Sequence, residues 1–259
     1  MLYLTVAIMV LALMGMIWCA KKQKVNANAQ AYAIICLVVV FVCAIAVMVQ
    51  TGVFGSNGET QRLIQNEMAY SRARAVVVGH YLAEKFPGSK ALVVTDGSQP
   101  LNQGQTQLLE GLKEGLGNAV SIEAAEGLPI DKSKMKPEEY RPMEEMMSAA
   151  LFDKFIARHP NATLLITLIG LPYDVSNMSL WRMPAATRPK VALLSGDIHQ
   201  LKSAVQAGYI VAAVAMRPDI KDIEAKAPSD AQKAFDLRYV LVTPDNVVKV
   251  ATDYKGIFE

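Results

Sequence analysis

The sequence predicts an α/β fold, a Rossmann-like three-layer domain with a mainly parallel sheet, preceded by two transmembrane helices. Two observations lead to this class. From about residue 89 onward, short apolar runs alternate with stretches of helical periodicity, which is typical of a parallel sheet covered on both faces. Before that region, the runs 1–20 and 31–49 are apolar and uncharged, and the basic segment 21–30 separates them.

The two N-terminal runs predict a transmembrane hairpin. Neither Met1–Ala20 nor Ala31–Val49 contains a charged side chain. At 1.5 Å per residue, about twenty apolar residues span a hydrocarbon layer of roughly 30 Å. Lys21, Lys22 and Lys24 lie in the connecting loop, and basic loops stay on the cytoplasmic side. We therefore expect a cytoplasmic loop and a large domain outside the cytoplasm, periplasmic or extracellular.

Two other interpretations of this region were weighed. A cleaved signal peptide could use Ala27-Asn28-Ala29 as its cleavage site, and a lipoprotein could use Cys19. Signal peptides carry their charge before the apolar stretch, which is also shorter than the one here. In the lipoprotein reading, Trp18 occupies a position that should be small. Two retained helices therefore remain the better interpretation.

Length, charge and cysteine positions limit what the rest of the chain can be. The chain has 259 residues, and removing the hairpin leaves roughly 200, enough for one domain with a full core. A net charge of +2 is too small for an electrostatic nucleic-acid footprint, so we expect no nucleic acid partner. The three cysteines, Cys19, Cys36 and Cys43, all lie in the apolar runs, which excludes a disulfide scaffold in the domain.

The sequence predicts that the segment 50–88 forms a neck and a linker helix. Ser56 and Glu59 have the spacing of a capping box, which predicts a helix over about Glu59–Phe86 that packs on the domain. Pro87-Gly88 should end it. The α/β domain then occupies residues 89–259.

Within the domain, strands and helices are expected in alternation, with the charged segment Gly127–Pro142 as a surface loop. The expected strands are Ala91–Thr95, Val120–Ala124, Thr163–Ile169, Val191–Leu194 and Ile210–Ala215. The expected helices are Gln103–Leu116, Met143–Arg158 and Ile198–Ala207. A C-terminal antiparallel hairpin is expected from Arg238–Thr243 and Val247–Thr252, which flank Pro244-Asp245-Asn246.

The candidate site lies in the loops that follow the strands. In open α/β sheets, ligands bind outside the carboxyl ends of the strands. The candidate ligand-binding residues in these loops are Asp96, Ser98, Gln99, Tyr173, Asp174, Asp197, His199 and Arg217. Carboxylates, hydroxyls, an amide, an aromatic ring and a guanidinium on one rim suit a small polar ligand. For any single residue, helix capping or turn formation is the commoner explanation, so the hypothesis depends on four loops converging.

Motifs for metal, cofactor or nucleophilic chemistry are missing from the sequence. Asp197-x-His199 resembles the opening motif of metallophosphoesterases, but the downstream motifs of that family do not occur, and the other histidines are His80 and His159. The chain also lacks the glycine-rich dinucleotide motif, the phosphate-binding P-loop and the serine-nucleophile elbow. We therefore assign no catalytic residue, no metal site and no cofactor.

Two stretches resemble sugar-binding proteins of the type I periplasmic-binding-protein class. LVVTDGS, followed by Leu108–Leu116, resembles the first strand, loop and helix of one lobe of those proteins. Lys190–Pro218 is similar to their strand–helix–strand units. The resemblance implies small-ligand binding at strand ends, with Asp96, Ser98 and Asp197 in matching loops. Those proteins close two lobes over a ligand, whereas roughly 200 residues make scarcely more than one.

Three functional hypotheses follow. The first is a membrane-anchored extracytoplasmic domain that binds or senses a small ligand, as a subunit of a transport or envelope complex. The second is a structural or assembly protein whose α/β domain docks a protein partner or a second copy of itself. The third is a membrane-tethered enzyme that uses the rim, which the missing motifs make the least favoured of the three.

Overall fold

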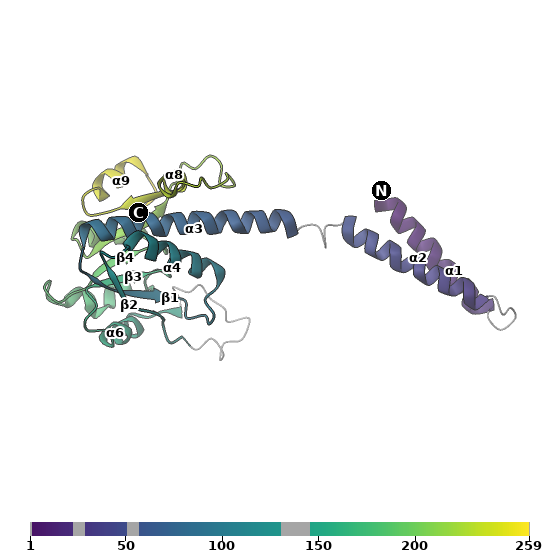
Figure 1. Ribbon diagram of the computed structural model, residues 1–259, viewed down its shortest axis with the longest axis horizontal. Coiled ribbons are helices and arrows are strands. Elements are labelled where there is room, and N and C mark those ends of the chain that lie inside the picture. Colours follow the sequence, from purple (N-terminus) through teal and green to yellow (C-terminus); the bar gives the residue numbers. More distant parts are fainter. Residues whose placement is uncertain (1, 23–28, 51–56, 131–145, 259) are drawn as a thin grey trace. The chain divides into compact units, whose positions relative to one another are not determined.

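A computed structural model describes residues 2–22, 29–50, 57–130 and 146–258 (Figure 1). The chain divides into two compact units, Met1–Ile64 and Gln65–Glu259. The first unit holds the apolar helices, and the second holds the sheet. Each is described by itself.

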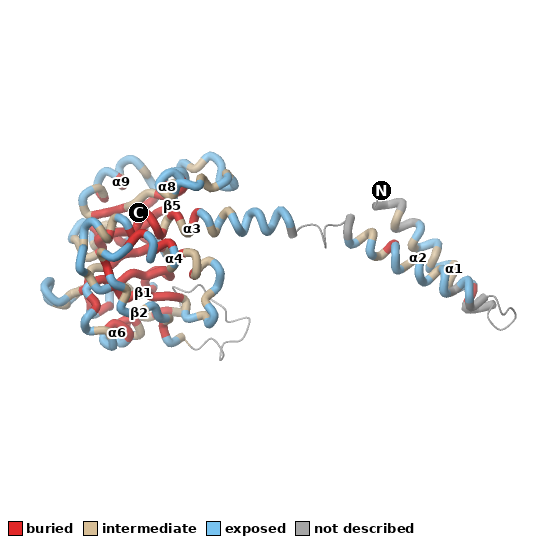
Figure 2. The backbone as a smooth tube through the Cα atoms, viewed as in Figure 1, coloured by how far each residue is buried: buried red, intermediate tan, exposed pale blue. Residues whose placement is uncertain are grey.

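The first unit contains two helices that pack against each other, α1 (Leu2–Lys22) and α2 (Ala29–Gln50). Both apolar runs are therefore helical, as predicted. Within the residues that the structure describes, no helix is long and apolar enough to cross a membrane. Many of the described apolar side chains of this unit face outward: Leu11 and Phe41 are each 67% exposed (Figure 2).

Helix α3 (Asn57–Lys85) connects to the second unit and becomes part of its core. Tyr70, Val78 and Leu82 on this helix have no exposed surface. It begins two residues before the expected start, and the proposed capping residue Ser56 lies outside the described residues. The second half of α3 is thus a structural layer of the α/β unit.

The second unit is built on a sheet with the order β2-β1-β3-β4-β5-β6. Its strands are β1 (Lys90–Thr95), β2 (Ser121–Gly127), β3 (Leu164–Thr167), β4 (Lys190–Leu193), β5 (Ile210–Met216) and β6 (Tyr239–Val242). All neighbouring pairs are parallel except β5 and β6, which are antiparallel. The mainly parallel sheet with helices on both faces confirms the α/β part of the predicted fold class.

Helices cover both faces of this sheet (Figure 1). One face packs against α6 (Ala149–Ala157), α7 (Lys202–Gln206) and α9 (Val247–Asp253). The other face packs against α3, α4 (Gln103–Leu116) and α8 (Ala231–Arg238). Short 3₁₀ turns at Val175–Asn177, Ser179–Arg182 and His199–Leu201 complete the connections.

Successive residues of a strand contribute to opposite faces, and β1 shows how this sheet fills both layers. Leu92 and Val94 belong to the core on the α6 face, and Ala91 and Val93 belong to the core on the α3 face. All four are completely buried. Figure 2 shows the same pattern, with buried residues concentrated in the strands.

The predicted C-terminal hairpin is wrong, because Val247–Asp253 forms helix α9. The β-branched residues there favour a strand locally. However, the buried residues Val247 and Val250 are three apart, the spacing of one helical face, and they pack into the core. The antiparallel partner of β6 is β5.

Three other boundaries differ from the expectation. Helix α6 begins at Ala149 because Ser148 caps it, accepting a hydrogen bond from the backbone of Leu151 at 3.3 Å; residues 131–145 lie outside the described chain. Strand β2 runs to Gly127, into the expected loop, because it pairs with β1 along its whole length. The expected helix Ile198–Ala207 is a 3₁₀ turn followed by the short α7.

Candidate functional site

The sheet order places a topological switch point between β1 and β3. From β1, the chain crosses to β2 on one side and then returns to β3 on the other. Loops diverge at such a point, which is where ligands bind in open α/β sheets. The loop after β1 and the segment after β3 are therefore the parts of the rim that bear on a ligand site.

Asp96 follows β1 directly and organises its loop. Its Oδ1 accepts hydrogen bonds from the backbone N–H of Ser98 at 3.0 Å and from the Ser98 hydroxyl at 2.6 Å. Its Oδ2 accepts a hydrogen bond from Nδ2 of Asn102 at 2.6 Å. Asn102 in turn caps α4, accepting a hydrogen bond from the backbone of Gln105 at 2.9 Å. The structure thus brings Asp96 and Ser98 together and ties both to the N-terminus of α4.

Gln105, which the sequence analysis missed, lies at the same point. It is 9% exposed, and its Nε2 donates a hydrogen bond to the backbone carbonyl of Leu168, just after β3, at 3.4 Å. Its Oε1 is buried and has no hydrogen-bond partner among the described residues. A buried acceptor without a donor costs free energy, so a hydrogen-bond donor brought within reach of this atom would stabilise the site.

Two close glycine contacts join the rim loops in pairs on either side of the switch point. A Cβ on Gly127 would lie 2.0 Å from the Cα of Gly97, so the loop after β1 touches the last residue of β2 through its backbone. A Cβ on Gly196, whose φ is +102°, would lie 2.5 Å from the Cα of Gly170, so the loops after β3 and β4 also touch. Between these pairs, the Gln105 side chain makes the link from α4 to the end of β3.

The remaining residues of the β1 and β3 loops have structural or exposed positions. Gln99 is exposed and precedes the cis-linked Pro100. Tyr173 is 72% exposed. Asp174 accepts a hydrogen bond from the backbone N–H of Ala149 at 2.8 Å, so its carboxylate caps α6. The convergence predicted for these three residues is not observed.

Asp197 and His199 also have a local role. Asp197 Oδ1 accepts a hydrogen bond from the backbone N–H of His199 at 2.8 Å, a local turn that leads into the 3₁₀ turn. The Nε2 of His199 lies 3.9 Å from the same oxygen, and both side chains are more than half exposed. In the described chain, no group of three potential metal-ligating side chains occurs.

Arg217, after β5, is held by neighbours outside the switch point. Its Nε and Nη2 donate hydrogen bonds to the carboxylate of Asp219 at 3.0 and 2.9 Å, and its Nη1 donates to the carbonyl of Asp236 at 2.6 Å. The hydrogen bond between the Arg217 and Asp219 side chains raises the pKa of Arg217 and lowers the pKa of Asp219. Of the eight predicted residues, the structure therefore gathers Asp96 and Ser98 at the switch point.

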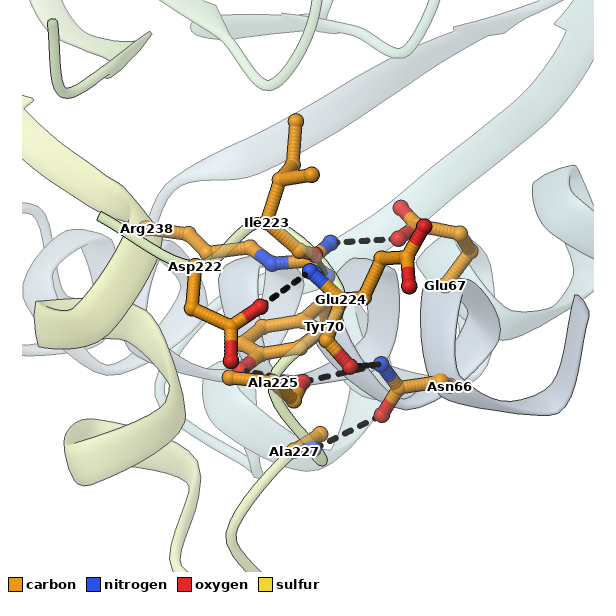
Figure 3. Close-up of polar contacts among 9 residues, drawn as sticks. All are labelled: Asn66, Glu67, Tyr70, Asp222, Ile223, Glu224, Ala225, Ala227 and Arg238. Atoms are coloured by element: carbon orange, nitrogen blue, oxygen red, sulfur yellow. Dashed lines mark hydrogen bonds and ion pairs between the residues drawn. The ribbon is translucent and has the colours of Figure 1, made fainter. Parts of the chain in front are cut away.

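A polar cluster that the sequence did not predict holds the loop after β5 on α3 (Figure 3). Nδ2 of Asn66 donates a hydrogen bond to the carbonyl of Ala225 at 2.9 Å, and its Oδ1 accepts one from the backbone of Ala227 at 2.7 Å. The Tyr70 hydroxyl donates a hydrogen bond to the same Ala225 carbonyl at 3.1 Å. The side-chain amide thus pairs with the loop as a backbone amide would.

A buried arginine, Arg238, and a half-buried one, Arg74, complete this cluster. Arg238 is 1% exposed, and its guanidinium carbon lies 3.5 Å from the centroid of the Tyr70 ring. It donates hydrogen bonds to Glu67 at 2.6 Å and to the carbonyl of Ile223. Burial lowers the pKa of Arg74, which lies over the Tyr239 ring. The cluster fixes the geometry between α3 and the end of α8.

Among known proteins, the chain is similar to solved structures only. No protein-family model matches the chain, and no curated protein matches it. An arabinose-binding protein from Geobacillus stearothermophilus is 14% identical, with a TM-score of 0.44 over 69% of this chain and 62% of its own. A sugar-binding protein of a sugar ABC transporter from Bacillus halodurans is 15% identical, with a TM-score of 0.45 over 68% and 63%.

A periplasmic solute-binding protein of an ABC transporter from Actinobacillus succinogenes, solved with D-allose, is 12% identical, with a TM-score of 0.43 over 71% and 62%. The chain spans less than two thirds of the length of each of these three proteins. These three similar structures are thus sugar- or solute-binding proteins. At such identities and TM-scores, the similarity carries no argument about what this chain binds.

Proposed function

We propose that this protein is a membrane-anchored extracytoplasmic domain that binds or senses a small, neutral, polar molecule at the β1–β3 switch point. The observation that carries the proposal is the buried Oε1 of Gln105, an acceptor without a partner among the described residues. A hydroxyl group of a sugar or polyol is a suitable donor for it. Asp96 and Ser98 hold the adjacent loop in a fixed conformation, which reduces the entropic cost of binding.

The membrane anchor in this proposal rests on the sequence. The runs 1–20 and 31–49 carry no charge, and the described apolar side chains of α1 and α2 are largely exposed. Contiguous exposed apolar surface indicates contact with a lipid or a protein. The basic loop between the helices supports an orientation in which the α/β unit lies outside the cytoplasm. The domain division proposed from the sequence, with a cytoplasmic loop 21–30 and an extracytoplasmic α/β domain from residue 89, follows from the same argument.

The function is tested by a thermal-shift screen of pentoses, hexoses, polyols and amino acids, followed by titration of each hit. Asp96→Asn should weaken binding by about tenfold or more, because an amide cannot accept all the hydrogen bonds that hold the loop. Asp197→Asn is the matched control: it also follows a strand, but it caps a turn, and Asn caps about as well as Asp. A screen without any hit contradicts the proposal and favours a docking function instead.

A further inference from the structure

The second feature with unused binding capacity is the outer edge of β6. In an antiparallel pair, residues alternate between bonding to the partner strand and facing away from it. The backbone N–H of Arg217 donates to the carbonyl of Arg238 at 2.9 Å, and the register continues without a shift. Val240 therefore bonds to β5, whereas Tyr239 and Leu241 direct their N–H and C=O groups to the open edge.

Most of these outward groups already have partners. The N–H of Tyr239 donates to the carbonyl of Phe235. The carbonyl of Leu241 accepts from Nδ2 of Asn246 at 2.8 Å, and the Oδ1 of Asn246 accepts from the backbone of Thr243 at 2.8 Å. In the described part of the chain, the carbonyl of Tyr239 and the N–H of Leu241 have no partner. One acceptor and one donor, on either side of Val240, are thus left at the edge.

A pocket of about 440 Å³ is lined by Tyr239, Val240 and Leu241, the residues that carry this pair of groups, and we call it the β6 pocket. Besides residues 239–241, it is lined by Tyr81 and Glu84 of α3, Asp236 of α8, Arg217 and Tyr254. Its volume is within the range of small-molecule sites. The rings of Tyr81 and Tyr254 are half-buried, so they offer apolar surface to a ligand.

The charges of the β6 pocket select against anions. Its lining carries two carboxylates, Glu84 and Asp236, and one arginine, Arg217, and a histidine, His80, also lines it. Arg217 is already bound to Asp219 and to the carbonyl of Asp236. The pocket therefore suits a neutral ligand with apolar faces.

We propose that the β6 pocket binds a neutral planar heterocycle that presents a hydrogen-bond donor and an acceptor side by side, as a nucleobase does. The donor bonds to the carbonyl of Tyr239, the acceptor bonds to the N–H of Leu241, and the ring packs on Tyr254 or Tyr81. An added peptide strand fits less well, because strand addition needs a continuing row of free groups, and Asn246 and Phe235 close this one at both ends. This site is separate from the one at the β1–β3 switch point.

The test is calorimetric titration of the full-length protein with adenosine, whose adenine edge carries an amino donor beside a ring-nitrogen acceptor. The matched probe is N6,N6-dimethyladenosine, which keeps the ring and lacks the donor. We expect it to bind about tenfold more weakly than adenosine. Adenosine monophosphate should also bind more weakly than adenosine, because its phosphate meets Glu84 and Asp236.

The variant for this test is Tyr254→Ala, and its control is Tyr173→Ala, which removes an exposed tyrosine outside the pocket. Loss of the ring should weaken adenosine binding by about fivefold or more, whereas the control should leave it unchanged. Failure of adenosine to bind overturns the proposal, and so does equal affinity for the dimethylated probe. Asp96→Asn should not affect adenosine, which separates this outcome from the test of the switch-point site.

Discussion

Arg238 and Glu67, which are 171 residues apart in the sequence, are joined by a hydrogen bond of 2.6 Å between Nη1 and Oε1. Only one of the two is buried: the Arg238 side chain is 1% exposed and that of Glu67 is 60% exposed. The Nε of Arg238 has no partner in the described chain. The pair therefore has an asymmetric energetic role, because loss of Glu67 leaves a buried charge, whereas loss of Arg238 leaves an exposed one.

The first prediction tests this asymmetry. Glu67→Ala should lower the free energy of unfolding by about 1–3 kcal/mol, because the buried guanidinium loses its carboxylate acceptor. Glu84→Ala, an exposed glutamate on the same helix, is the control and should change it by less than about 0.5 kcal/mol. Urea unfolding of both variants measures the difference. Equal stability of the two would show that solvent already compensates Arg238.

The second prediction concerns the loop 222–227. Asn66→Ala removes the side chain that bonds to both Ala225 and Ala227, so the amide of Ala227 should exchange with solvent faster than in the parent protein. Hydrogen exchange followed by NMR measures this directly. Amides of the buried strand β4 serve as the internal reference and should keep their protection. Unchanged exchange at Ala227 would mean that Tyr70 alone holds the loop.

The third prediction concerns stability at alkaline pH. Burial, and then the charge of Asp245, raise the pKa of Tyr81 above its ordinary value of 10.0. The folded state thus holds this proton more tightly than the unfolded state does. The resulting stability is complete below the unfolded pKa and is lost as the pH rises through the folded pKa. Urea midpoints should therefore fall less between about pH 8 and pH 11 for Tyr81→Phe than for the parent. Tyr173→Phe, at an exposed position, should show the parental decline.

The fourth prediction is the topology. A cysteine placed at Ser229, with the three native cysteines replaced, should react with a membrane-impermeant thiol reagent in intact spheroplasts. The reason is the proposed topology, in which the positive charge of Lys21, Lys22 and Lys24 would keep their loop in the cytoplasm and the α/β unit outside. Ser229 is exposed, so accessibility is not limiting. Labelling only after lysis would show that the α/β unit faces the cytoplasm, which would contradict the prediction.

The sequence predicts the parallel sheet well because its signals are local. Helix α4 has the expected bounds, Gln103–Leu116, since its apolar spacing and the glycine after it are both in the segment itself. Val247–Asp253 was assigned to a strand because β-branched residues dominate it. Which of its faces is buried depends on packing against the core, which no local pattern contains.

The location of the candidate site could be predicted from the sequence, but only some of its residues could. Asp96 and Ser98 were found because they follow a buried strand directly. Asp174 and Asp197 also lie in loops after strands, yet they cap α6 and hold a local turn, as aspartates in loops commonly do. Gln105 gave no signal, because a glutamine in the first turn of a helix is ordinary. Only the fold shows that it reaches Leu168 and is buried.

The most direct test of the switch-point site is the melting temperature of Gln105→Met, measured with and without the compounds that stabilise the parent. Met has a similar shape and removes both the unpartnered acceptor and the 3.4 Å hydrogen bond to Leu168, so the free variant should fold with a stability close to that of the parent. The proposal predicts that a sugar or polyol raises the melting temperature of the parent and leaves that of Gln105→Met unchanged. Equal shifts in both proteins, or no shift in either, would contradict it.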